Sequence, residues 1–229
     1  MEFKVDSEKC IKCGLCAVDC PFGIITPPEG NNLPGINEER APYCIKCGHC
    51  QAVCPVGASS LDYEGADESF YPTDKVFVEP KKLADHIRLR RSVRKYKAEA
   101  VTKELIGELV DIARYAPTGT NRQPVRWIVT YGHDKVHKLG EGVINWMEKA
   151  AKENSPYNKV LPLAAFVKAW KNGVDTIFHS APHIITACAH KDNMIAHIDS
   201  AIALTYMELI MPSYGIGTCW AGLFELVLA

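Results

Sequence analysis

The sequence predicts an α+β protein in two parts, a small cysteine-rich module followed by a larger α+β domain. Eight of the ten cysteines fall within residues 10–54, in two runs of identical spacing. Helical periodicity begins only at Lys81, and the apolar run Val125–Tyr131 beyond it is typical of a buried strand. A polar stretch with a few aromatic residues separates the two patterns. We therefore expect three segments: a module at 1–60, a linker at 61–80 and a domain at 81–229.

The two cysteine runs share one frame, in which three cysteines at two-residue gaps precede a three-residue gap, a fourth cysteine and a proline. The runs are Cys10-x-x-Cys13-x-x-Cys16-x-x-x-Cys20-Pro21 and Cys44-x-x-Cys47-x-x-Cys50-x-x-x-Cys54-Pro55. In the bacterial iron–sulfur run with this spacing, the fourth cysteine ligates the other cluster. The sequence thus predicts two [4Fe–4S] clusters, one held by Cys10, Cys13, Cys16 and Cys54, the other by Cys44, Cys47, Cys50 and Cys20.

Zinc and disulfide bonds are the competing interpretations of these cysteines. Zinc prefers four tetrahedral ligands, usually from CxxC pairs or histidines, and a triplet with one outlying cysteine fits that poorly. Disulfides need an oxidising compartment, whereas Met1 is followed by neither a basic nor an apolar segment of an export signal. We expect a cytoplasmic protein. No membrane partner is expected either, because the longest apolar stretch contains His197, Asp199 and Glu208.

Charge is distributed unequally along the chain. Residues 1–80 carry 6 Lys and Arg against 13 Asp and Glu, a net of −7, and residues 81–229 carry 20 against 14, a net of +6. The difference indicates two functional parts; it reflects either solvated surfaces or modules that attract each other. Residues 81–97 hold eight basic residues and one acid, which suits a bound phosphate. Because no nucleic-acid fold signature accompanies them, we expect no nucleic-acid partner.

The larger part shows the start and stop signals of several helices. Thr102 is placed as an N-cap before an apolar stripe, and Pro117 should stop that helix. Further helices are expected at 133–152, at 160–172 with Gly173 as the C-cap, and after Asp192–Asn193. Four aromatic residues of the middle segment could form core or line a substrate site, and we favour core: Trp146, Tyr157, Phe166 and Trp170.

Two resemblances cover nearly the whole chain. Residues 3–60 resemble the two-cluster bacterial ferredoxins in their cysteine frames. Residues 81–229 resemble the FMN-dependent nitroreductase family, on the segments Arg90-Arg91-Ser92-Val93-Arg94, Ala116-Pro117-Thr118-Gly119-Thr120-Asn121-Arg122-Gln123-Pro124 and Tyr214-Gly-Ile-Gly-Thr-Cys-Trp-Ala-Gly222. The resemblance implies an α+β sandwich, a mixed sheet flanked by helices, and a homodimer. By motif match it implies FMN-binding roles for Arg90, Arg91, Ser92, Arg94, Pro117, Thr118, Gly119, Asn121, Gln123, Trp220, Ala221 and Gly222.

One departure concerns the end of the sequence. Members of that family usually continue with another strand and basic residues that complete the phosphate site, whereas this sequence ends at Leu226–Ala229. We therefore expect either a further tail or a site that closes differently.

The combined resemblance implies an iron–sulfur flavoprotein that passes electrons from the clusters to FMN and on to a small acceptor, such as a nitro compound or quinone. No side chain is expected to act as a catalytic nucleophile. The electron donor would be a ferredoxin or NAD(P)H; no Gly-x-Gly-x-x-Gly fingerprint follows a strand, so a separate Rossmann site is not expected. The alternative is a non-enzymatic electron carrier whose flavin relays electrons to a protein partner.

Overall fold

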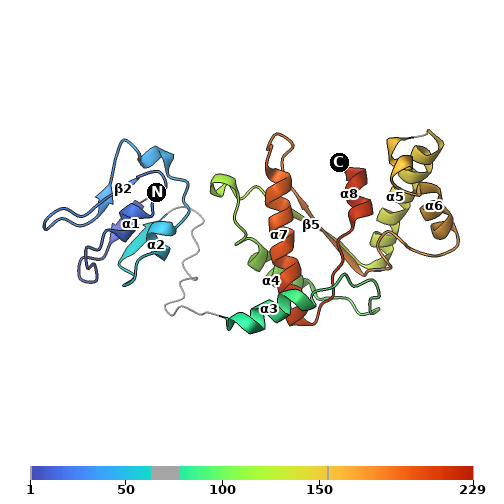
Figure 1. Ribbon diagram of the computed structural model, residues 1–229, viewed down its shortest axis with the longest axis horizontal. Helices are drawn as coiled ribbons and strands as arrows, with labels where there is room; N and C mark the ends of the chain where they lie inside the picture. Colours follow the sequence, from blue (N-terminus) through green and yellow to red (C-terminus); the bar gives the residue numbers. More distant parts are fainter. Residues whose placement is uncertain (1, 63–77, 154, 229) are drawn as a thin grey trace. The chain divides into compact units, whose positions relative to one another are not determined.

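The computed structural model describes residues 2–62, 78–153 and 155–228. Most of the expected linker, residues 63–77, lies outside these described residues. The chain forms two compact units. The first comprises the described residues up to Glu79 together with Thr120–Arg122, and the second comprises Pro80–Gly119 and the described residues from Gln123 onward. Mixed helix and sheet in the second unit agrees with the predicted α+β class (Figure 1).

The first unit is built from very short elements held by two antiparallel strand pairs. Strand β1 pairs with β4 in a register that sets Glu2 opposite Asp62, and β2 pairs with β3 with Ile25 opposite Ile36. The stretch Pro27–Pro42 between the two cysteine runs is rich in Pro, Gly and Asn, a composition that predicts a loop, yet β3 forms within it. The elements are β1 (Glu2–Val5), α1 (Leu15–Val18), β2 (Ile25–Thr26), β3 (Gly35–Ile36), η1 (Ala41–Tyr43), α2 (His49–Ala52) and β4 (Ser59–Asp62).

The sequence repeat of the first unit is also a backbone repeat. Gly14 and Gly48 have φ values of 73° and 71° and directly precede α1 and α2. This left-handed conformation is open to glycine without steric cost, so the third cysteine of each run can turn back into a one-turn helix. The core of this unit is very small. Its buried members are Cys16, Ile24, Ile25, Cys50 and Leu61.

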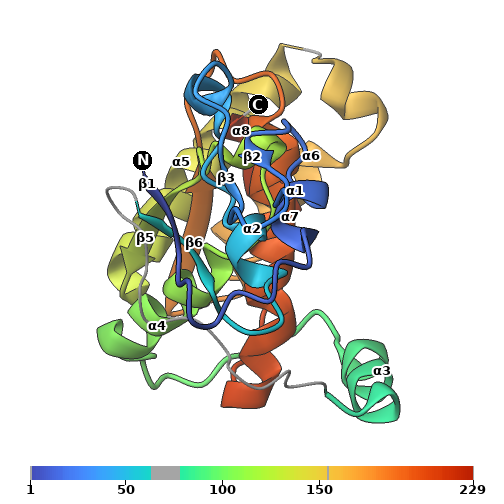
Figure 2. The same cartoon turned by 90° about the vertical axis from the view of Figure 1, so that its left-hand side faces the viewer.

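The second unit contains the longer helices and one antiparallel strand pair, β5–β6. Among the described residues, this antiparallel pair is the part of the predicted mixed sheet that forms in the second unit. Helix α7 packs against β6 and α4, and α5 packs against α6 (Figures 1 and 2). The elements from residue 80 onward are α3 (Pro80–Leu89), α4 (Lys103–Ala113), η2 (Gly119–Asn121, of which Thr120 and Asn121 belong to the first unit), β5 (Arg126–Tyr131), α5 (His133–Lys152), η3 (Pro156–Lys159), α6 (Leu163–Lys171), β6 (His183–Cys188), α7 (Ala196–Ile210), η4 (Met211–Tyr214) and α8 (Gly222–Leu228).

Two apolar clusters form the core of the second unit. One joins α5, α6 and α8 around Met147 and Leu163, which are 0% and 1% exposed. The expected aromatic residues, Trp146, Tyr157, Phe166 and Trp170, all pack against this cluster, which confirms the core interpretation. The other joins α4 to α7 and η4 around Leu109 and Met207. This second cluster fixes α7, along which the candidate flavin-site segments are anchored.

Local signals located most helix boundaries correctly. The Thr102 hydroxyl accepts a hydrogen bond from the Leu105 N–H at 3.2 Å, as an N-cap does. Helix α5 spans the expected residues, and Gly173 follows α6 with φ 79°. Helix α7, however, begins at Ala196 without a side-chain cap, because the Asn193 side chain instead accepts from the Ile195 N–H in the preceding turn.

Candidate functional site

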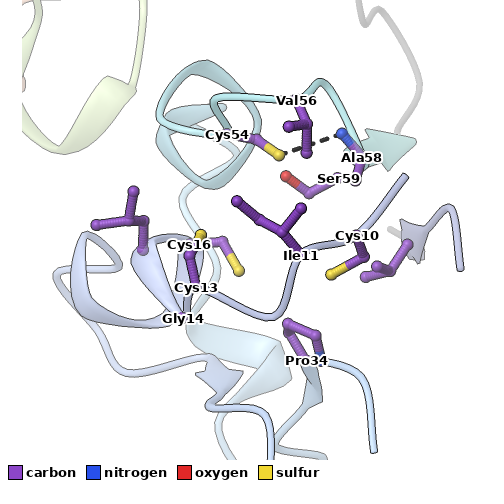
Figure 3. Close-up of a pocket in the computed structure, with 12 residues that line it drawn as sticks. Cys10, Ile11, Cys13, Gly14, Cys16, Pro34, Cys54, Val56, Ala58 and Ser59 are labelled. Carbon is purple, nitrogen blue, oxygen red and sulfur yellow. Dashed lines mark hydrogen bonds between the residues drawn. The ribbon is translucent and has the colours of Figure 1, made fainter. Parts of the chain in front are cut away.

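The cysteines of the first unit line two separate cavities. The first cavity contains the triplet of the first run and the last cysteine of the second run: Cys10, Cys13, Cys16 and Cys54 (Figure 3). They come from the loop before α1, from α1 itself and from the turn before β4. The rest of the lining is apolar or small, including Ile11, Pro34 and Val56. The structure therefore brings together the four residues that the crossed frame predicts for one cluster.

The second cavity repeats this arrangement with the remaining cysteines. It is lined by Cys20 from the first run and by Cys44, Cys47 and Cys50 from the second. Ile24, Ile25 and Leu61 supply apolar walls. His49 lines this cavity, whereas Leu15 occupies the matching position in the first. In each cavity the thiols surround a space: among the described residues, no three His, Cys, Asp or Glu side chains are grouped to hold a single metal ion.

Backbone N–H groups point at the fourth cysteine of each run. The Ile24 N–H donates to Cys20 Sγ at 3.3 Å, and the Ala58 N–H donates to Cys54 Sγ at 3.1 Å. Such bonds favour the thiolate form, which is the form that ligates metals. Burial raises the pKa of the Cys54 thiol, but N–H groups of Val56, Ser59 and Ala58 together outweigh it, so the pKa is lowered overall.

The third cysteine of each run has the opposite electrostatics. Burial, followed by the neighbouring thiols Cys47, Cys20 and Cys44, raises the pKa of Cys50 to about 12. Burial likewise raises the pKa of Cys16, with Cys13 and Cys54 adding to the effect. Several thiolates in one apolar cavity repel one another unless a cation lies between them. The chemistry of each cavity therefore suits a positively charged iron–sulfur core, whose binding would deprotonate the thiols.

Two of the three segments predicted to bind flavin lie together in the second unit. The Val93 N–H donates to the Thr218 carbonyl at 2.8 Å, so the segment Arg90–Arg94 runs beside the segment that leads into Trp220. Gly217 makes this approach close: a Cβ at this position would lie 2.7 Å from Val93 Cγ2. The Tyr96 hydroxyl donates to the Val93 carbonyl at 2.7 Å, and burial raises the pKa of Tyr96 to about 12.

The arginines of this segment have different partners. Arg90 Nη1 lies 2.9 Å from Glu208 Oε1, in an ion pair whose side chains are 34% and 21% exposed. The Thr218 hydroxyl donates to the same oxygen at 3.4 Å. Arg91 Nη1 donates to the Arg88 and Arg90 carbonyls, at 2.6 and 2.8 Å.

Arg94 and Ser92 complete the polar set of this segment. Arg94 Nη1 lies 3.5 Å from the Ser92 carbonyl, a marginal contact, and its side chain is exposed. Arg94 is thus better placed than Arg90 to bind an anion without first breaking an ion pair. The Trp220 indole N–H donates to Glu225 Oε2 at 2.8 Å, which fixes the ring beside Ala221 and the first turn of α8 at Gly222.

The third predicted segment is anchored elsewhere on α7. The Gly119 N–H donates to Asp199 Oδ1 at 3.1 Å, and the Gln123 N–H donates to Thr118 Oγ1 at 3.0 Å. Pro117 precedes this turn. Asn121 groups with the first compact unit, where its side-chain amide donates to the Ile45 and Lys46 carbonyls at 3.0 Å.

Sequence reasoning missed two acids that contact the predicted flavin segments. Glu208 holds Arg90, and Asp199, only 3% exposed, holds Gly119. Both interrupt the apolar stretch of α7, and that position was the available signal, because an acid inside an apolar helix needs a partner. Within the described ranges, none of the helices combines the length and the apolar character that crossing a bilayer requires.

Comparison with known proteins gives family matches for both parts. Residues 87–227 match the Nitroreductase family, and residues 9–58 match the 4Fe-4S dicluster domain. A Methanothermobacter thermautotrophicus protein named as an NADH dehydrogenase/NAD(P)H nitroreductase is 27% identical over 150 residues, which are 63% of this chain. The match spans 62% of that relative's length.

Solved structures show the same fold for the larger part. A nitroreductase with bound FMN from Desulfitobacterium hafniense aligns with TM-score 0.52 at 21% identity, covering 64% of this chain and 73% of that one. A nitroreductase with bound FMN from Bacteroides fragilis aligns with TM-score 0.51 at 21% identity, covering 62% of this chain and 70% of that one.

Proposed function

We propose, since this chain belongs to the nitroreductase family, that it passes electrons from two [4Fe–4S] clusters to FMN and on to a small acceptor, such as a nitro compound or quinone. The observation that carries this proposal is the grouping of eight cysteines around two cavities in a chain that also has a nitroreductase domain. A nitroreductase domain alone needs no such cysteines. Their presence favours a route in which the clusters deliver electrons to the flavin one at a time.

The ligand sets that we propose follow the cavities. One cluster is held by Cys10, Cys13, Cys16 and Cys54, and the other by Cys20, Cys44, Cys47 and Cys50. Thiolates are the ligands that such clusters use. The match of residues 9–58 to a 4Fe-4S dicluster domain supports this assignment.

FMN is the proposed second cofactor, and the residues of the larger unit fit it. Ser92 and Arg94 would hold its phosphate or ribityl side, and the backbone around Ala221 would face the ring. Bound flavin supplies the ability to accept electrons singly and deliver them in pairs. The chain's own residues orient the ring, neutralise its charge and restrict access to it.

A homodimer is the assembly we propose. Helix α7 is apolar on nearly every side, yet Ile198 and Tyr206 are 50% and 43% exposed in the single chain. A helix that is apolar all round is normally covered. Asp199 and Glu208 are nine residues apart, roughly 13 Å along a helix, so the two halves of the flavin site are anchored at separate points of α7. A second chain would cover α7 and complete each site. Sedimentation that finds two chains per particle would support this assembly.

The electron donor and acceptor belong to the same proposal. The name of the archaeal relative favours NAD(P)H as a donor, and a ferredoxin is the other candidate. The direct test is anaerobic reduction of the loaded protein, first with NADH and then with dithionite, followed by addition of p-nitrobenzoate or menadione. We expect the bleached cluster and flavin absorbance to return as acceptor is consumed. If the reduced protein is reoxidised by a protein acceptor but not by these small molecules, the chain is instead an electron carrier.

Replacing Arg94 with alanine should weaken FMN binding. A hydrogen bond to a charged group contributes about 1.5–3 kcal/mol, so we expect the FMN dissociation constant to rise about ten- to hundredfold. Arg88→Ala is the matched control, because the Arg88 side chain is exposed and pairs with its helix neighbour Asp85. Flavin fluorescence titration of both variants measures the effect, and equal affinities in the two would remove Arg94 from the site.

A further inference from the structure

The least exposed acid in the second unit is tied to one loop. Asp199 is 3% exposed and lies in the first turn of α7. Its Oδ1 accepts from the Gly119 N–H at 3.1 Å, while its Oδ2 is buried and has no hydrogen-bond partner among the described residues. A buried acid with one oxygen unsatisfied costs stability. The hydrogen bond to Gly119 offsets part of this cost.

The bonded loop is short and conformationally unusual. Thr120 and Gln123 have φ values of 51° and 47°, which residues other than glycine seldom adopt. The Thr118 hydroxyl accepts a hydrogen bond from within the loop, donated by the Gln123 N–H. The Gly119 backbone is close against Ile195, whose Cδ1 would lie 2.1 Å from a Cβ at this position. Asp199 therefore supplies a polar link from this loop to the packed helix α7.

We propose that Asp199 is a positioning residue for the flavin site: it fixes the Pro117–Gly119 loop on α7 through the Gly119 N–H, without touching the flavin itself. This inference rests on the proposed function. A loop held in its binding conformation before the ligand arrives loses less freedom on binding, which raises affinity. The bond requires only an acceptor oxygen at the Oδ1 position. An asparagine can supply that oxygen, whereas an alanine cannot.

Asp175 provides a matched control within the same unit. Its carboxyl oxygens accept from the Ile177, Phe178 and Ser180 N–H groups, each at 2.9 Å. It therefore orders a loop in the same chemical way, and it holds no segment predicted to contact flavin. If losing an Asp–backbone bond has a purely structural effect, that effect should be equal in the alanine variants of Asp175 and Asp199.

The experiment compares Asp199→Ala, Asp199→Asn and Asp175→Ala in the full chain, prepared anaerobically. We expect Asp199→Ala to raise the FMN dissociation constant at least about tenfold, with iron content unchanged. Asp199→Asn should remain within about threefold of the unsubstituted chain, and Asp175→Ala should bind FMN normally despite a lower melting temperature. Unchanged FMN affinity in Asp199→Ala, or equal losses in Asp199→Ala and Asp175→Ala, would overturn the proposal.

Hydrogen exchange gives a readout that does not depend on flavin binding. In the flavin-free chain, peptides covering residues 116–123 should lose protection in Asp199→Ala and keep it in Asp175→Ala. Peptides covering residues 175–182 should show the reverse. If the unsubstituted chain binds no FMN, the proposed function fails while this exchange pattern still tests the link. Rapid exchange at 116–123 in the unsubstituted chain would show that Asp199 does not hold the loop.

Discussion

Removing two cysteines from one cavity should cost the protein one cluster, whereas removing two cysteines from one run should cost it both. Cys10 and Cys54 line the same cavity although 43 residues separate them. Cys10 and Cys20 belong to the same run but line different cavities. The double variant Cys10→Ala/Cys54→Ala should therefore lose about four irons per chain, and Cys10→Ala/Cys20→Ala about eight.

The measurement is iron and acid-labile sulfide per chain after anaerobic reconstitution. Cys188→Ala is the control, since Cys188 lies in β6 of the second unit and lines neither cavity. Assignment of each run to its own cluster predicts the reverse order, with the same-run pair keeping half of the iron. That reversed result would contradict the crossed ligand sets.

Removing the clusters should unfold the first unit and leave the second folded. Among the described residues, the apolar cluster of the first unit has five buried members, and two of them, Cys16 and Cys50, are proposed ligands. Its helices α1 and α2 have four residues each, too short to be stable alone. Burial raises the pKa of the Cys16 and Cys50 thiols, and a bound cation would offset this effect. Metal binding must therefore supply much of the folding free energy of this unit.

Hydrogen exchange after anaerobic iron chelation measures this directly. We expect peptides within residues 2–62 to lose nearly all protection. Peptides of α5, which buries Val136, Val143 and Met147 in the core of the second unit, should stay protected and serve as the internal control. Protection that persists in residues 2–62 after the iron has gone would mean that the polypeptide folds without its clusters.

Local signals predicted those parts of the structure that depend on near neighbours. The N-cap at Thr102 and the bounds of α5 depend on residues within a turn of each other. The grouping of the cysteines around two cavities was predictable because, in runs of this spacing, the fourth cysteine is expected beside the triplet of the other run. The start of α7 was misplaced because Asn193 can cap either a helix or a turn, and the surrounding packing selects the turn.

The contacts that sequence reasoning missed join residues far apart in the chain. Arg90 and Glu208 are 118 positions apart, and Gly119 and Asp199 are 80 apart. Arg90 was predicted as a phosphate ligand from its motif. Its ion pair with Glu208 means that this carboxylate competes with the phosphate for the Arg90 guanidinium. Such pairings follow from how α7 is placed against the predicted flavin segments, which no periodicity or capping signal specifies. Arg90 remains a predicted flavin residue.

The most direct test of the central claim is the cofactor content of the chain purified without oxygen. Iron, acid-labile sulfide and flavin would be counted against chain concentration, alongside a visible spectrum. The account predicts about eight irons and eight sulfides with one FMN per chain, and broad cluster absorbance that bleaches on reduction. Flavin without iron after anaerobic reconstitution, or iron in full measure with no flavin bound at saturating FMN, would contradict an iron–sulfur flavoprotein.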